Sequence, residues 1–256
     1  MRGVSKMTSD LVEKVRRHYS LRRNVIYRIK LATEGATGRL ITHNFKRIVG
    51  LLSPYNKGEK VVDIGCGWGY LLSFLPSYVD VYAFDLSREM LEISRAFRGK
   101  ANRVIVDAQC IGARDNYFDK FFCLGLVGHI PRVNDALREI YRILKPNGRG
   151  VINFTNKLGL MNIPYTILRL KVGYYFKYNT LAPLDESFTY WEAKEALEDA
   201  GFLVERSYGW GFSVPYSIGK RFPNFSDRIT ECIIRVKDSW IIKHMSNAHV
   251  FLVRKP

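Results

Sequence analysis

Short apolar runs alternate with amphipathic segments along most of this chain. Residues 61–64, 81–84 and 104–106 are rich in β-branched and aromatic side chains, and the runs at 118–126 and 150–154 continue the series. Apolar runs of four to eight residues bounded by turn residues are typical of buried strands. Their alternation with helical segments predicts an α/β fold with a parallel sheet covered on both faces.

The helical segments carry apolar side chains every three or four residues. Leu11, Val15, Tyr19 and Ile26 predict an amphipathic helix over about 9–32, and a second helix with Ile41, Phe45, Ile48 and Leu52 inward follows it. A helix over 137–144 is stopped by Pro146, and one over 192–200 is closed by Gly201. Strands at 202–208 and 249–253 complete the series.

Two segments interrupt this plan and set the expected domain boundaries. Residues 156–188 hold many aromatic residues and lie where a lid over a ligand site is expected, although packing against the N-terminal helices would equally account for them. Residues 209–247 form a second insertion. We therefore expect a helical cap at 1–57, a ligand-binding core at 58–155, a lid at 156–188 and completion of the sheet at 189–256.

Three glycines at every second position follow the first strand, at Gly65, Gly67 and Gly69. Glycine has no Cβ, so such a loop can adopt positive φ angles and bring its backbone close to a ligand, or simply form a turn. A dinucleotide-binding fingerprint would require a further glycine where Tyr70 stands, which argues against a nicotinamide-dependent dehydrogenase.

An acid follows each of the next two strands. Asp85 lies 20 residues after Gly65, a spacing typical of ribose-binding acids, and Asp107 repeats the arrangement after the third strand. The alternative for Asp85 is a helix N-cap, because Ser87 and Glu89 also suit a first helical turn.

These motifs together resemble the class I S-adenosylmethionine-dependent methyltransferases, in particular the branch that acts on quinones and other small molecules. The resemblance covers about 58–154 and resumes at 187–207. It rests on D-I-G-C-G-W-G, F-D-L-S-R-E-M-L, D-A-Q, G-H-I-P and R-I-L-K-P-N-G in that order. Asn147 replaces a glycine of the family's last turn, and asparagine tolerates the same left-handed backbone.

The resemblance implies a Rossmann-like, doubly wound, mainly parallel seven-stranded sheet with an antiparallel last strand. It implies S-adenosylmethionine as cofactor and S-adenosylhomocysteine as product. The residues that it assigns to cofactor binding are Asp63, Gly65, Cys66, Gly67, Gly69, Asp85, Leu86, Asp107, Ala108, Leu124 and Gly125.

His129 is the candidate catalytic residue. In the family's arrangement it lies near the reactive end of the cofactor, where a neutral imidazole could take a proton from a hydroxyl nucleophile. The alternative is that it orders its loop through backbone contacts. Aromatic side chains expected around the pocket are the substrate candidates, with a role in the core as the alternative: Tyr19, Tyr27, Tyr190 and Trp191.

The net charge of +16 is concentrated at the start of the chain, where residues 1–60 hold 14 Lys or Arg against 4 Asp or Glu. Such a segment could steer an anionic substrate, a nucleic acid or an acidic membrane surface, or it could simply maintain solubility. The four cysteines show neither disulfide nor zinc-site spacing, so no metal is expected. No signal peptide or membrane-spanning run is apparent, which predicts a cytoplasmic protein.

The sequence therefore predicts a methyltransferase acting on a small molecule. One alternative is an RNA methyltransferase that uses the basic N-terminal segment. Another is a protein that binds S-adenosylmethionine without catalysis. The acceptor and the oligomeric state are left open.

Overall fold

The computed structural model describes residues 12–14, 16–17, 26, 29–30, 33–159, 186–210, 228, 244 and 246–256. Most of the helix expected over 9–32 lies outside these residues, as do most of the two expected insertions. The candidate substrate residues Tyr19 and Tyr27 also lie outside them.

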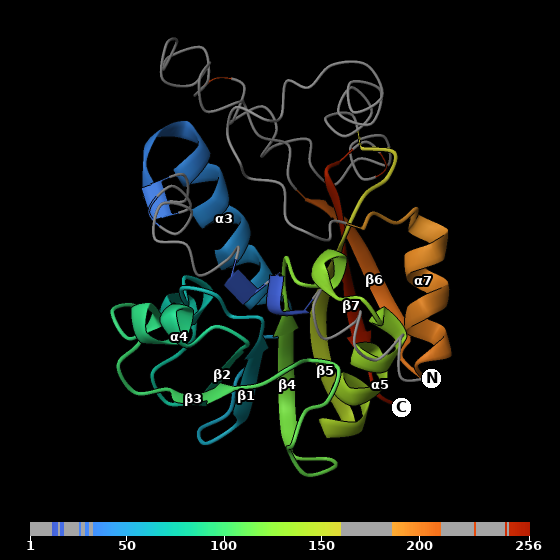
Figure 1. The fold of residues 1–256 in the computed structure, drawn as a ribbon, viewed down its shortest axis with the longest axis horizontal. Helices are drawn as coiled ribbons and strands as arrows, with labels where there is room; N and C mark the ends of the chain where they lie inside the picture. The colour runs from blue at the N-terminus through green and yellow to red at the C-terminus, as the bar shows by residue number, and fades with distance from the viewer. Residues whose placement is uncertain are drawn as a thin grey trace.

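A single sheet of seven strands forms the centre of the described fold, in the order β3-β2-β1-β4-β5-β7-β6. The first five strands pair in parallel, and β7 lies antiparallel between β5 and β6. This confirms the predicted sheet with its antiparallel last strand (Figure 1). The strands are β1 (Lys60–Ile64), β2 (Asp80–Asp85), β3 (Asn102–Ile105), β4 (Phe118–Cys123), β5 (Leu144–Thr155), β6 (Leu203–Trp210) and β7 (Ala248–Arg254).

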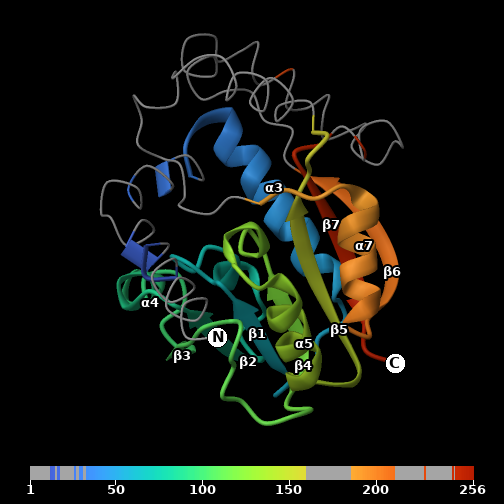
Figure 2. The same cartoon turned by 45° about the vertical axis from the view of Figure 1, so that its right-hand side comes forward.

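Helices cover both faces of the sheet. The described ones are α3 (Gly35–Leu51), α4 (Arg88–Ser94), α5 (Val133–Ile143) and α7 (Tyr190–Asp199), with short 3₁₀ turns η1 (Leu71–Phe74) and η2 (Val127–His129). Side chains of α5 and α7 pack into one apolar cluster, and those of α3 and α4 pack into the cluster on the opposite face. Figure 2 shows α5 and α7 on the near side of the strands, with α3 behind them.

Neighbouring residues on the central strands face opposite clusters. Val61 packs on the side of α3 and Val62 on the side of α5, while Phe122 and Phe121 repeat this division on β4. All four side chains are fully buried. The strands therefore read as continuous apolar runs, because both faces of a parallel sheet are covered.

Several predicted boundaries are shifted by local backbone geometry. β3 runs from Asn102 to Ile105, so it begins two residues and ends one residue earlier than expected. β4 ends at Cys123 and is shorter than expected; after it the chain turns at Gly125, whose φ is 68°. Pro146 does not stop the preceding helix, because Leu144 is already extended and pairs with Phe118. As predicted, Asn147 takes a left-handed conformation, with φ at 61°.

α7 begins two residues earlier than expected. Thr189 caps it by accepting a bond from the backbone N–H of Glu192, and the Glu192 side chain accepts one in return from the Thr189 backbone. This reciprocal capping box draws Tyr190 and Trp191 into the first helical turn. β6 in turn extends beyond the predicted residue 208 to Trp210.

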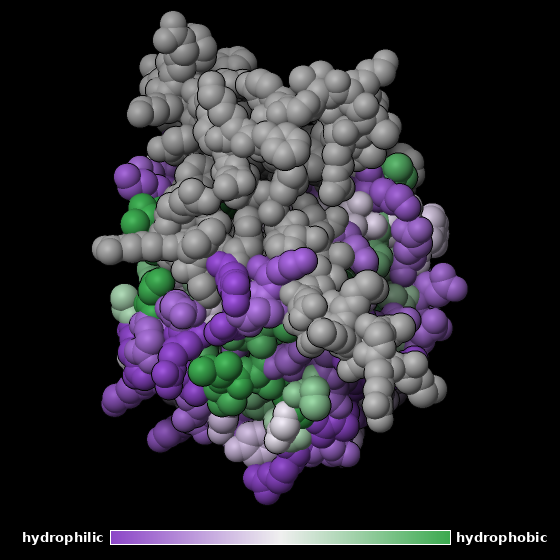
Figure 3. Space-filling view, in the orientation of Figure 1, coloured by the Kyte–Doolittle hydropathy of each residue, from purple (hydrophilic) through white to green (hydrophobic). Residues whose placement is uncertain are grey.

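β3 forms one edge of the sheet and carries exposed apolar side chains. Val104 and Ile105 are 43% and 53% exposed. The face in Figure 3 shows a hydrophobic surface in front of β2 and β3. Among the residues that the structure describes, no helix is long and apolar enough to span a membrane.

Candidate active site

A cavity of about 420 Å³ lies at the carboxyl ends of the parallel strands. Open α/β sheets bind ligands at this edge, and the volume is within the range of small-molecule sites. Eleven of the residues expected at the site line it: Asp63, Gly65, Cys66, Gly67, Asp85, Leu86, Asp107, Ala108, Leu124, Gly125 and His129. Of the residues expected to bind cofactor, Gly69 alone is not part of the lining.

The three glycines of the loop after β1 have different surroundings, although all have positive φ. A Cβ on Gly65 would lie 2.9 Å from the Leu126 side chain, and one on Gly69 would lie 2.6 Å from Cβ of Ser94. A Cβ on Gly67 would meet no atom within 4 Å. Gly65 and Gly69 are thus required by packing as well as by φ, whereas Gly67 presents open backbone to the cavity.

The carboxylate of Asp85 fixes this loop from the end of β2. It accepts a hydrogen bond from the backbone N–H of Gly67 at 2.8 Å and one from Ser87 at 2.9 Å. The N-cap of α4 is Ser87, whose hydroxyl accepts a bond from the Met90 N–H. Asp85 is therefore not the helix cap, and its carboxylate lines the cavity.

Asp63 is a second acid in the same part of the cavity, and it is almost entirely buried. Burial, with a smaller contribution from the charge of Asp85, raises the pKa of Asp63 to about 8. Burial also raises the pKa of Asp85. Two desolvated carboxyl groups suit a ligand that brings positive charge and hydroxyl groups to this end of the cavity.

Cys66 lies in the same loop and lines the cavity. Its thiol is buried, and burial is the main cause that raises its pKa well above the usual value. The thiol therefore stays neutral, consistent with a small side chain that fills space in the loop.

The loop after β3 is ordered around Asp107. The Asp107 carboxylate accepts bonds from the backbone N–H of Gln109 at 2.9 Å and from its amide Nε2 at 3.0 Å. The Gln109 amide oxygen in turn accepts a bond from the Arg132 backbone. Ala108 and Gln109 are buried, so this wall of the cavity has a defined shape.

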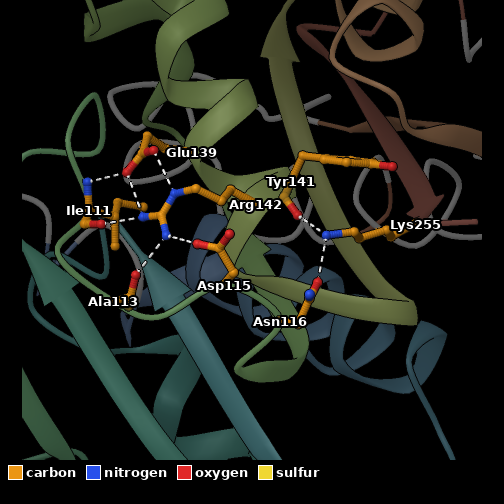
Figure 4. A network of polar contacts seen from close by, with 8 residues as sticks. All are labelled: Ile111, Ala113, Asp115, Asn116, Glu139, Tyr141, Arg142 and Lys255. Carbon is orange, nitrogen blue, oxygen red and sulfur yellow. Dashed lines mark hydrogen bonds and ion pairs between the residues drawn. The ribbon is translucent and has the colours of Figure 1, made fainter.

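A polar network holds the next part of this loop against α5 (Figure 4). The Arg142 guanidinium donates to the carbonyls of Ile111 and Ala113 and to the carboxylates of Asp115 and Glu139. Glu139 also accepts the backbone N–H of Ile111 at 2.7 Å. One ion pair on the helix thus anchors the segment that continues from Asp107.

The opposite wall comes from the ends of β4 and β5. The Asn153 side-chain oxygen accepts the backbone N–H of Gly125 at 2.6 Å, which holds the turn after β4. His129 follows in η2 and lines the cavity. This position is compatible with either of its predicted roles.

Five aromatic residues that line the cavity are not among the site residues expected from the sequence: Phe45, Trp68, Tyr70, Phe84 and Trp210. Trp68 and Tyr70 could have been identified, because they stand within and beside the glycine loop. Trp210 could not, because its position depends on where β6 joins the sheet. Val12 and Arg16 of the N-terminal segment also line the cavity.

Tyr190 and Trp191 lie away from this wall. Tyr190 stacks on Phe251 with ring centroids 5.5 Å apart, and Trp191 is 71% exposed. Neither lines the described cavity. The structure therefore favours the core alternative for Tyr190, while a substrate role for either residue stays a prediction.

Comparison with known proteins identifies the domain. Residues 62–152 match a family model described as a methyltransferase domain. The chain carries a class I S-adenosylmethionine-dependent methyltransferase domain. The match covers the glycine loop, Asp85 and Asp107, so several of the residues that carried the resemblance also line the cavity.

Individual methyltransferases support this assignment. The chain is 26% identical over 162 residues to a ubiquinone biosynthesis O-methyltransferase of Xanthomonas oryzae pv. oryzae, covering 58% of this chain and 67% of that protein. A solved S-adenosylmethionine-dependent methyltransferase of Thermotoga maritima, a possible histamine N-methyltransferase, has the same fold. Its TM-score is 0.67 at 19% identity, with 94% of this chain and 100% of that chain covered.

The methyltransferase uses S-adenosylmethionine. A phosphoethanolamine N-methyltransferase 2 of Haemonchus contortus, solved with this cofactor, shares the fold with a TM-score of 0.56 at 18% identity over 84% of this chain and 52% of that chain. The open backbone at Gly67 and the two buried acids fit such a ligand, which carries a ribose diol and positive charge.

Proposed function

We propose that this methyltransferase transfers a methyl group to a small-molecule acceptor bound in the same cavity. The observation that carries the proposal is the shared lining of one cavity by the glycine loop, Asp63 in β1, Asp85 at the end of β2, Asp107 after β3, and His129. A cavity of this size favours a small molecule over a polymer. The ubiquinone and phosphoethanolamine methyltransferases among the relatives are named for small acceptors.

The bound cofactor supplies a sulfonium methyl group, which an acceptor lone pair attacks while the methyl–sulfur bond breaks and its electrons remain on sulfur. In our proposal Asp85 holds the ribose hydroxyls, Asp107 and Ala108 contact the adenine, and Asp63 faces the methionine end. The remaining lining positions, Cys66, Leu86, Leu124 and Gly125, shape the walls. Such a displacement requires mainly alignment and exclusion of water.

His129 has two candidate roles. As a general base it would accept the proton that a hydroxyl acceptor loses. As a loop-ordering residue it would leave the proton to solvent. Replacing it by alanine and recording turnover against pH separates these roles, because loss of a base removes a titration from the profile and loss of loop order lowers turnover at every pH.

The domain division proposed from the sequence assigns distinct parts to this function. The core at 58–155 holds the cofactor, the segments at 1–57 and 156–188 close over it, and 189–256 completes the sheet. We also propose a cytoplasmic location, supported by the free thiols of Cys66, Cys110 and Cys123 among the described residues.

The test is to purify the protein, identify any bound nucleoside by mass spectrometry, and screen acceptors for release of S-adenosylhomocysteine. Release with a small molecule, and transfer of a labelled methyl group to it, is the expected result. Labelling of RNA alone, with binding that weakens steeply with salt, would favour the RNA alternative. Tight cofactor binding with no transfer to either class would favour a non-catalytic role.

A further inference from the structure

The cavity has an aromatic wall, which we define as Phe45, Tyr70 and Trp210. The three residues come from α3, the glycine loop and the end of β6, and all line the cavity. The Phe45 ring packs edge-on against both others, with centroids 5.6 Å from Tyr70 and 5.6 Å from Trp210. Segments far apart in sequence thus build one continuous apolar surface.

The aromatic wall begins beside the glycine loop and extends away from Asp85 and Asp107 toward the other edge of the sheet. In the strand order, Asp85 and Asp107 follow β2 and β3 near one edge of the sheet, whereas Trp210 ends β6 at the other edge. Arg16 is the one lysine or arginine among the described lining residues, and it pairs with Glu13 at 2.8 Å within the N-terminal segment. The cavity therefore has a polar, charged end and an aromatic end.

Further contacts fix the rings of the aromatic wall in place. The Tyr70 hydroxyl forms a 2.7 Å hydrogen bond with the hydroxyl of Thr42 on α3. Trp68 stacks on Tyr70 with centroids 4.8 Å apart and an interplanar angle of 25°. Phe74 lies behind, 5.1 Å from Tyr70 and 6.3 Å from Phe45. The wall is thus formed by packed side chains that are only partly buried.

We propose that the aromatic wall is the acceptor subsite and that it takes a planar, uncharged ring. This inference rests on the proposed function, since it assigns the end of the cavity that the cofactor acids leave free. A planar ring gains specific stacked or edge-to-face contacts with such a wall, which a saturated ring of similar size does not. None of the roles assigned to the other described lining residues accounts for these three aromatic side chains.

The probe is 1-naphthol, titrated by calorimetry into protein saturated with S-adenosylhomocysteine, and decahydro-1-naphthol is its saturated counterpart. The variants are Trp210→Leu and Phe45→Leu, which keep apolar volume but remove the ring. Tyr70→Phe removes the bond to Thr42 alone and serves if either leucine variant unfolds. Tyr78→Leu is the matched control, because Tyr78 is 50% exposed, precedes β2 at the amino ends of the parallel strands, and does not line the cavity.

Wild-type protein is expected to bind 1-naphthol more tightly than its saturated counterpart. Each leucine variant should weaken 1-naphthol binding by roughly threefold to tenfold. Tyr70→Phe should weaken it by a smaller factor, and Tyr78→Leu should leave it unchanged. Affinity for S-adenosylhomocysteine should stay within twofold in every variant.

Three results would overturn the inference. The first is equal binding of the two probes, or no binding of 1-naphthol, by the wild-type protein. The second is a loss of S-adenosylhomocysteine affinity in the leucine variants that is as large as their loss of 1-naphthol affinity. That result would assign the rings to the cofactor. The third is loss of S-adenosylmethionine affinity alone, which would assign them to the sulfonium. Failure of the wild-type protein to bind either nucleoside would instead reject the proposed function itself.

Discussion

The Asp85 carboxylate accepts a hydrogen bond from the backbone N–H of Gly67 at 2.8 Å, so the acid at the end of β2 holds the loop after β1. This bond leaves the carboxylate facing the cavity with further acceptor capacity. One residue thereby shapes the glycine loop and presents an acceptor to a ribose diol.

Asp85→Ala is expected to lower the affinity for S-adenosylhomocysteine by roughly tenfold to a hundredfold, about 1.5–3 kcal/mol. The loss has two physical causes, the missing ribose bonds and the released Gly67 N–H. Isothermal titration calorimetry measures it, with Glu195→Ala on the exposed face of α7 as the control. An unchanged dissociation constant would remove Asp85 from the cofactor site.

The surroundings of Gly67 and Gly69 predict different effects of the same substitution. Gly69→Ala should lower the free energy of unfolding by about 3 kcal/mol or more, because its methyl group meets Ser94 and its φ is 80°. Gly67→Ala should cost about 1–2 kcal/mol from φ alone, and should weaken cofactor binding in addition. Urea unfolding and calorimetry test this pair, and equal losses of stability would contradict it.

Asp63 predicts a pH dependence of stability in the absence of cofactor. Its pKa is about 8 in the folded protein against an ordinary value of 3.8. The folded state therefore binds the proton more tightly, so the stabilisation is complete below pH 3.8 and is lost as the pH rises to about 8. Between pH 5 and pH 8, wild-type protein should lose more unfolding free energy than Asp63→Asn, as urea titrations would measure; parallel profiles would refute the raised pKa.

Arg142→Met tests the anchor of the loop that carries Asp107. Removing a charged donor with several partners should lower the free energy of unfolding by about 1.5–3 kcal/mol and weaken S-adenosylhomocysteine binding. Arg138→Met, one turn away on the same helix and 66% exposed, should change stability by less than about 0.5 kcal/mol. Thermal unfolding with and without nucleoside compares the two variants. If the two variants lose the same stability and nucleoside affinity, Arg142 contributes no more than an exposed ion pair.

Ile105→Lys tests the exposed edge of the sheet. A lysine on an edge strand opposes pairing with other chains, and Ile105 is 53% exposed, so the cost in stability should be small. Light scattering at rising protein concentration should show less self-association than in the wild-type protein. More aggregation, or a large fall in melting temperature, would mean that Ile105 is needed for packing.

The predictable part of the fold and site is the part encoded locally. Gly65 and Asp85 stand at a fixed spacing around one strand, so their shared position at the carboxyl edge follows from the parallel sheet. The start of α7 is also encoded locally, since Thr189 and Glu192 form a capping box. The apolar pattern nevertheless predicts a start two residues later. Asp107 could be placed at the cavity although β3 ends one residue earlier than expected.

The remaining features depend on contacts between distant segments. The packing requirement at Gly69 comes from Ser94 on α4, and the aromatic wall depends on β6 occupying the edge of the sheet. Neither contact has a local signature. Trp210 therefore cannot be predicted as a site residue until the strand order is known.

The place of β7 between β5 and β6 also bears on how the protein is made. During translation, β5 emerges from the ribosome long before its antiparallel neighbour Ala248–Arg254 exists. Until then the edge of β5 over 149–155 presents unpaired backbone groups, and β6 has no strand to join. Nascent chains arrested before residue 248 should consequently depend on chaperones in a way that chains released after β7 do not.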